Sequence, residues 1–259
     1  MKSGTLAILN ILGLILVLLV NTLANTLPLN GLNTGQVSAM YPNLFVPAGF
    51  TFSIWSVIYV LMIGFTATSV RWLWHVPGSV IGKLCREVSP LFIFSCIANA
   101  SWIIVWHHLQ VGLSLVIMLA LLYLLILIYI RLQPYRGSLT GLKKIFLYSF
   151  FVVYLGWISV ATIANATALL VSIKWGGFGL HPAIWSMTMM AVAIFLAILF
   201  IWKRKDHAYA WVVAWALVGI NGSQGELMPS IGQLALGGTA LIFLFSALTL
   251  YMDRERKMA

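Results

Sequence analysis

The chain has 259 residues, of which 62% are hydrophobic and 8% are charged, and its formal net charge is +10. A soluble globule of this length needs far more polar surface, so the composition excludes a soluble domain and indicates an integral membrane protein. In a soluble protein the basic excess would suggest a nucleic-acid partner. Here we expect none, because membrane topology accounts for the basic residues.

Apolar runs of about 17 to 25 residues, the length that an α-helix needs to cross a bilayer, occur eight times. The predicted spans are 5–26, 50–73, 89–108, 111–131, 145–173, 182–202, 207–222 and 230–251. The seventh run is short and ends in GINGSQGE. The first run has a basic start and small residues at its end, so a cleaved signal peptide is an alternative, although the run is long for a signal. We predict an all-α, multi-pass membrane protein with eight helices in contact with the lipid bilayer.

The distribution of charge predicts the orientation of these spans. With eight of them, every basic residue except Lys174 falls on one side of the membrane. This bias is the positive-inside pattern, so we expect both termini in the cytoplasm, in a bacterial cytoplasmic membrane. Cys85, in a predicted inner loop, and Cys96, in the third span, lie at different levels and form no disulfide framework or metal site.

The sequence offers no catalytic constellation. It lacks a phosphate-binding glycine loop, a zinc-binding HExxH, a GxSxG nucleophile elbow and an acidic pair inside a span. The histidines, including His107 and His108 of a tight outer turn, are expected to be interface residues rather than ligands. We therefore predict no catalytic residue and no metal site, and ion-coupled transport lacks an intramembrane charge.

Aromatic and amide residues instead gather in the outer halves of three spans, at helical spacing. An amide that faced lipid would cost several kcal/mol, so Asn99 and Asn165 are expected to point into the bundle or a cavity. The alternative to a pocket is that these amides only join helices, through hydrogen bonds worth roughly 0.6 to 2 kcal/mol each. The candidate ligand-binding residues are Phe52, Trp55, Tyr59, Asn99, Trp102, Trp157, Ala161 and Asn165.

Three of these stretches resemble motifs of the translocator protein family, also called tryptophan-rich sensory or TspO/MBR proteins. YLGWISVATIAN (154–165) is similar to the family's fifth-helix motif, with the same separation between tryptophan and asparagine. NASWIIVW (99–106) and WSVIYVLM (55–62) resemble its third-helix and second-helix segments, in the same order. The chain departs from the family at GFTFSIW (49–55), where a tryptophan and a Gly-Pro pair are missing, and at Val153 and Ala164, which replace Pro and Leu.

The resemblance implies a five-helix core over residues 1–173, with a three-helix extension over 174–259 that has no counterpart in short family members. It also implies that the first outer loop, about 27–48, covers a pocket formed by the motif aromatics. Family members bind porphyrins and other flat tetrapyrroles, so a bound porphyrin or heme-like tetrapyrrole is the expected ligand, while no cofactor is required. Aromatic walls with a few amide donors suit flat, largely apolar molecules.

The sequence therefore predicts a membrane receptor, sensor or carrier for a hydrophobic small molecule, which can also form a homo-oligomer. A permease for a small apolar solute is the alternative, since GINGSQGELMP resembles a discontinuous helix of the kind that lines transport sites. A third alternative is an enzyme that acts on a bound pigment or lipid, although no activated nucleophile or acid/base pair supports it.

Overall fold

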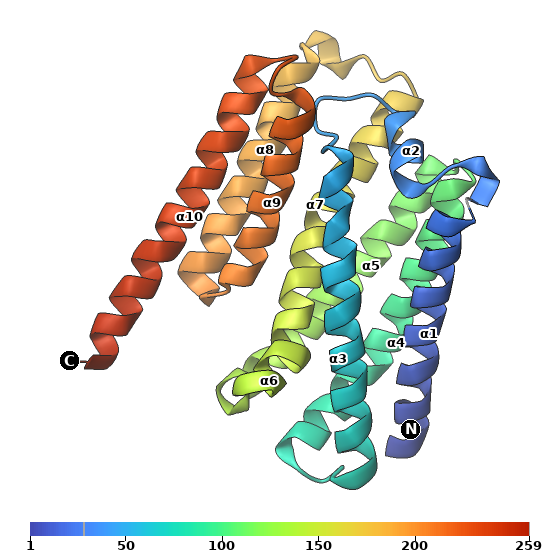
Figure 1. Ribbon diagram of the computed structural model, residues 1–259, viewed down its shortest axis with the longest axis vertical. Coiled ribbons are helices and arrows are strands. Elements are labelled where there is room, and N and C mark those ends of the chain that lie inside the picture. The colour runs from blue at the N-terminus through green and yellow to red at the C-terminus, as the bar shows by residue number, and fades with distance from the viewer. Residues whose placement is uncertain (28, 259) are drawn as a thin grey trace. The chain divides into compact units, whose positions relative to one another are not determined.

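The computed structural model describes residues 1–27 and 29–258 (Figure 1). Helices account for 86% of it and the described residues form no strand, which confirms the predicted all-α fold. The chain forms two compact units, Met1–Met40 with Ser53–Ile158 and Tyr41–Phe52 with Ser159–Ala259. The predicted modules, 1–173 and 174–259, instead divide the chain after the fifth span. That division concerns modules of the family and stays a prediction.

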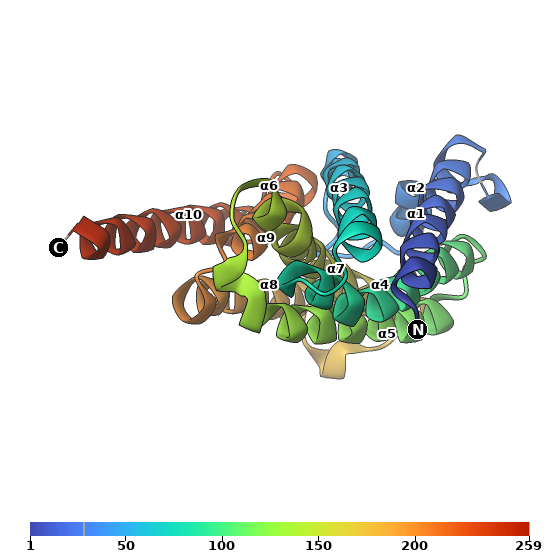
Figure 2. The ribbon, with the colours of Figure 1, turned by 90° about the horizontal axis from the view of Figure 1, so that it is seen from below.

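The first unit is a bundle in which consecutive long helices run in opposite directions, so α1 and α4 run parallel. α1 packs against α3 and α4, and α4 also packs against α3 and α5, so these helices lie side by side (Figures 1 and 2). Leu109, at φ 58°, lies in the tight reversal between α4 and α5. The helices of this unit are α1 (Ser3–Thr26), α2 (Thr34–Ala39), α3 (Ile54–His75), α4 (Val80–His107), α5 (Val111–Leu132), α6 (Gly141–Lys144) and α7 (Phe150–Ser172) up to Ile158.

Four buried phenylalanines form the centre of this bundle. The ring centroids of Phe65 lie 4.6 Å from Phe92 and 4.9 Å from Phe151, and those of Phe150 and Phe151 lie 4.4 Å apart. Lipid tails are as apolar as these side chains, so the contacts stabilise the bundle by close packing rather than by the hydrophobic effect. Aromatic pairs in tilted or edge-on arrangements add roughly 0.5 to 1.5 kcal/mol each.

A buried polar contact, absent from the sequence prediction, joins the first three long helices. Asn10 Nδ2 donates to Ser69 Oγ at 3.1 Å and to Ser89 Oγ at 2.8 Å, and none of the three side chains is exposed. The two serine hydroxyls donate in turn to the carbonyls of Thr66 and Cys85 on their own helices. α1 is therefore held to α3 and α4 by directional bonds as well as by packing.

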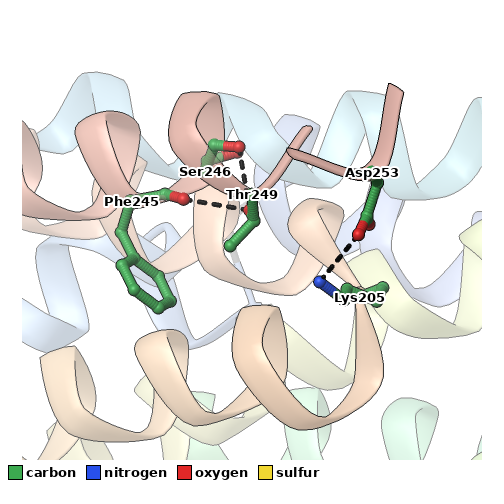
Figure 3. Close-up of polar contacts among 5 residues, drawn as sticks. All are labelled: Lys205, Phe245, Ser246, Thr249 and Asp253. Carbon is green, nitrogen blue, oxygen red and sulfur yellow. Dashed lines mark hydrogen bonds and ion pairs between the residues drawn. The ribbon is translucent and has the colours of Figure 1, made fainter. Parts of the chain in front are cut away.

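The second unit contains α8 (Pro182–Leu199), α9 (His207–Gln224) and α10 (Pro229–Met258), which pack against one another. The ion pair between Lys205 Nζ and Asp253 Oδ1, at 3.1 Å, ties the residues before α9 to α10 (Figure 3). Both side chains are partly exposed, so the pair contributes at most about 1 kcal/mol. Thr249 Oγ1 bonds to the carbonyls of Phe245 and Ser246 within α10 (Figure 3).

Seven helices among the described residues are long and apolar enough to cross a membrane, which confirms a multi-pass protein. They correspond to every predicted span except the seventh, which is α9. At 1.5 Å per residue its 18 residues extend about 27 Å, but His207, Asn221 and Gln224 reduce its apolar character. The total of eight spans therefore stays a prediction.

The main error in the predicted helix boundaries is at the start of α4, which begins at Val80 rather than 89. The prediction followed the apolar run, whereas the helix continues through charged residues beyond it. The carbonyl of Glu87 accepts a bond from Arg131 Nη1 at 3.0 Å, which ties this turn to α5. Cys85 accordingly lies buried in α4 and not in a loop.

Candidate functional site

Four aromatic side chains from α3 and α7 meet in the first unit, and we call them the aromatic cluster: Trp55, Tyr59, Tyr154 and Trp157. Trp55 stacks on Tyr59, with ring centroids 5.7 Å apart and planes 23° apart. Trp55 also meets Tyr154 and Trp157 edge-on, at 6.1 and 6.2 Å. Spacings of four residues on α3 and three on α7 place each pair on one face of its helix. Tyr154 and Trp157 are buried, whereas Trp55 and Tyr59 are half-buried and form its accessible part.

A chain of amides fixes the position of Tyr154. Asn21 Nδ2 donates to Asn99 Oδ1 at 2.9 Å, and Asn99 Nδ2 donates to Tyr154 Oη at 3.0 Å. We call Asn21, Asn99 and Tyr154 the amide relay. Asn21 is itself oriented by a bond to the carbonyl of Val17. The relay joins α1, α4 and α7 through side chains that are at most 4% exposed. The amide of Asn99 is therefore engaged from both ends by protein groups.

Sequence reasoning missed two members of this arrangement. Asn21 was treated as part of an apolar span, and Tyr154 only as one letter of a motif. A polar side chain inside a span was a signal for Asn21, because its amide needs a partner in the bundle. Asn99 was expected to point into the interior, and it is fully buried.

Trp102 lies in a different group, at the end of α4 where the chain turns into α5. It stacks on Trp106 with ring centroids 5.9 Å apart and planes 17° apart. Trp106 Nε1 donates to the carbonyl of Thr34 at 3.4 Å, at the start of α2. Trp102 is thus connected through Trp106 to the segment predicted as the first outer loop, while Trp55 and Trp157 belong to the aromatic cluster.

His107 holds the same loop, which corrects its expected role as an interface residue. Its imidazole is fully buried, with Nε2 3.0 Å from Thr34 Oγ1 and Nδ1 3.3 Å from the carbonyl of Leu29. Its carbonyl accepts a bond from Asn30 Nδ2 at 3.2 Å. Residues 29–34 are therefore fastened to the end of α4, while Pro28 of the predicted lid lies outside the described residues.

Three predicted site residues belong to the second unit. Phe52 lies in its segment Tyr41–Phe52, and Ala161 and Asn165 lie on the later turns of α7. Asn165 is 3% exposed, as expected for an amide that does not face lipid. The interpretation that all eight residues line one pocket stays a prediction.

The aromatic cluster can bind a molecule by stacking and by a few hydrogen bonds. The polar groups of its two half-buried side chains are the phenol of Tyr59 and the indole N–H of Trp55, which suit polar groups on an otherwise apolar ligand. The rings of Trp55 and Tyr59 are near-parallel and half-buried, and flat conjugated molecules pack well against the faces of such rings.

Comparison with known proteins identifies the family. The model of the family described as TSPO-like protein matches residues 7–248. No curated protein and no solved structure matches the chain significantly. The match continues well past residue 173, where the motif resemblance was expected to end, so α8, α9 and most of α10 are also part of the family pattern. It supports a membrane sensor or binding protein in general, and the chain belongs to the TSPO-like protein family.

Proposed function

We propose that this protein is a membrane receptor, sensor or carrier for a hydrophobic, porphyrin-like ligand that stacks on the aromatic cluster. The observation that carries the proposal is the half-buried pair Trp55 and Tyr59, backed by buried Tyr154 and Trp157. Such rings bind flat ligands at small entropic cost, because packing already restricts their rotamers. The amide relay keeps the backing ring of Tyr154 in place.

The first test is a titration of the purified protein with protoporphyrin, followed by the Soret absorbance of the porphyrin. Absorbance is preferable to tryptophan emission because some variants remove a tryptophan. Trp55→Ala should weaken binding roughly tenfold or more, from the loss of one stacking surface and its buried area. Asn165→Ala tests whether the predicted pocket extends along α7.

A matched control comes from the same helix. Trp74 lies near the end of α3 and is 50% exposed, so Trp74→Ala makes the same chemical change away from the cluster. It should leave the affinity unchanged. Equal affinities of the wild type, Trp55→Ala and Trp74→Ala, or no binding beyond that of empty micelles, would refute the proposal.

Transport is the alternative function. α9 is continuous to Gln224 and α10 begins at Pro229, so the GELM segment between them (225–228) connects two helices rather than interrupting one. The discontinuous helix that favoured a permease is therefore absent from this part of the described chain. Saturable porphyrin flux into proteoliposomes would make the protein a carrier, and binding without flux would make it a receptor.

The orientation of the chain in the membrane is also part of the proposal. The charge bias favours both termini in the cytoplasm of a bacterium. Alkaline phosphatase is active only outside the cytoplasm, because it needs disulfide bonds. A fusion of this enzyme to either terminus should therefore be inactive, and an active fusion would reverse the assignment. A homo-oligomer stays a prediction, which the mass of the detergent-free protein in nanodiscs would test.

A further inference from the structure

Within the second unit, the segment Tyr41–Phe52 is bound along one face of α9. The Ala48 amide donates to the carbonyl of Gly219 at 2.8 Å, and Ser223 Oγ donates to the carbonyl of Val46 at 2.6 Å. Trp215 Nε1 donates to the Thr51 carbonyl at 2.9 Å. The donors and acceptors on α9 recur every four residues, so they lie on one face of the helix.

Shape complementarity accompanies these bonds. The side chain of Thr51 is fully buried and occupies the space that a Cβ atom at Gly219 would need. Such a Cβ atom would overlap Thr51 Oγ1 and lie 2.9 Å from Thr51 Cβ. The ring of Phe50 packs edge-on against Trp215, with centroids 5.5 Å apart. Gly219 is thus required for the close approach of the segment to α9.

The bound segment leads directly into α3. A 3-10 turn, Gly49–Ser53, is followed by α3 without a break, and the two together form one candidate span. Thr51 precedes Trp55 by one helical turn, and Tyr59 follows one turn later. A restraint on Thr51 therefore acts on the chain one turn before the first of the two accessible rings.

We infer that Trp215, Gly219 and Ser223 of α9 are positioning residues for the ligand site, acting on the start of α3 through residues 46–51. The expected effect on ligand affinity rests on the proposed function, whereas the expected effect on the start of α3 does not. It gives α9 a role that the sequence prediction left open.

The test uses the full chain in detergent and two measurements. Gly219→Ala should raise hydrogen exchange at the amides of residues 46–58, because Ala48 loses its bond and the first turn of α3 loses its support. It should also weaken protoporphyrin binding about fivefold or more, the lower end of coupling between sites. Trp215→Phe, which keeps the ring but removes the N–H donor, should have a smaller effect in the same direction.

Two further variants separate positioning from general damage. Gly237→Ala is the matched control, because a Cβ atom there meets nothing within 4 Å, and it should change neither measurement. Thr51→Ala combined with Gly219→Ala removes Oγ1 and Cγ2, two of the three atoms closest to the new Cβ atom, and should restore much of both protection and affinity.

Each outcome decides the inference. Unchanged exchange in Gly219→Ala, or lost protection with unchanged affinity, would overturn it, and so would a double variant no better than the single one. If the wild type binds no porphyrin, the proposed function fails. Exchange at residues 54–58 of α3 then still decides whether α9 positions this helix: faster exchange supports the inference and unchanged exchange refutes it.

Discussion

The amide relay gives a prediction that separates helix packing from ligand binding at Asn99. Its carboxamide accepts a bond from Asn21 and donates one to Tyr154, at 2.9 and 3.0 Å, and the side chain is fully buried. Asn99→Ala removes both bonds. At roughly 0.6 to 2 kcal/mol for each interhelical bond in a membrane, the variant should lose about 1 to 4 kcal/mol of stability.

The appropriate assay is reversible unfolding in mixed micelles, with Tyr154→Phe and the double variant measured beside Asn99→Ala. Tyr154→Phe removes only the bond between the phenol oxygen and Asn99, so it should cost about 0.6 to 2 kcal/mol. The two changes share that bond. The double variant should therefore lose less than the sum of the single variants, with a coupling of about 0.5 kcal/mol or more.

The same variants test whether Asn99 also binds the ligand. Because the amide of Asn99 is engaged by Asn21 and Tyr154, Asn99→Ala should reduce porphyrin affinity less than Trp55→Ala does. Additive stability losses in the double cycle would refute the relay. An affinity loss at Asn99 larger than that at Trp55, with stability unchanged, would show that this amide binds the ligand directly.

Two further predictions concern packing in the two units. On α10, Gly238→Leu should lower stability by about 1 to 3 kcal/mol in a thermal unfolding measurement, since a Cβ atom there overlaps the end of the Ile194 side chain. Gly237→Leu, facing open space, should cost less than 1 kcal/mol, the usual loss for a tolerated surface change, and equal losses would contradict this packing. In the first unit, His107→Ala removes the partner of Thr34 and should speed proteolysis within residues 29–37, whereas an unchanged cleavage rate would show that the imidazole does not hold the loop.

The sequence predicted the spans well for a physical reason. Lipid excludes unpaired backbone groups, so a long apolar run has few alternatives to a helix. The same logic failed at α4, where the helix continues through Lys83 and Arg86 beyond the apolar run. Long basic side chains reach the interface from a helical backbone, so a charge ends the hydrophobic run without ending the helix.

Only part of the candidate site could be predicted from the sequence. Trp55, Tyr59 and Trp157 could be identified because helical spacing and motif resemblance pointed to the same residues. The choice of Asn21 as the partner of Asn99 depends on which turn of α1 faces α4, and one sequence contains no such information. Trp102 matched a motif, yet it stacks on Trp106. The spacing of four residues between these two tryptophans places them on one face of α4 and was a signal for this contact.

Two residues of the aromatic cluster lie close in sequence to points at which the chain passes from one unit to the other. The chain passes from the second unit to the first at Ser53, two residues before Trp55, and returns after Ile158, one residue after Trp157. These two crossings lie inside helical segments, whereas the earlier one, from Met40 to Tyr41, lies in a turn. This connectivity explains why the predicted pocket residues are divided between the units, although the motifs that carry them are continuous. A ligand stacked on Trp55 and Trp157 would therefore contact α3 and α7 beside two of the three points at which the chain passes from one unit to the other.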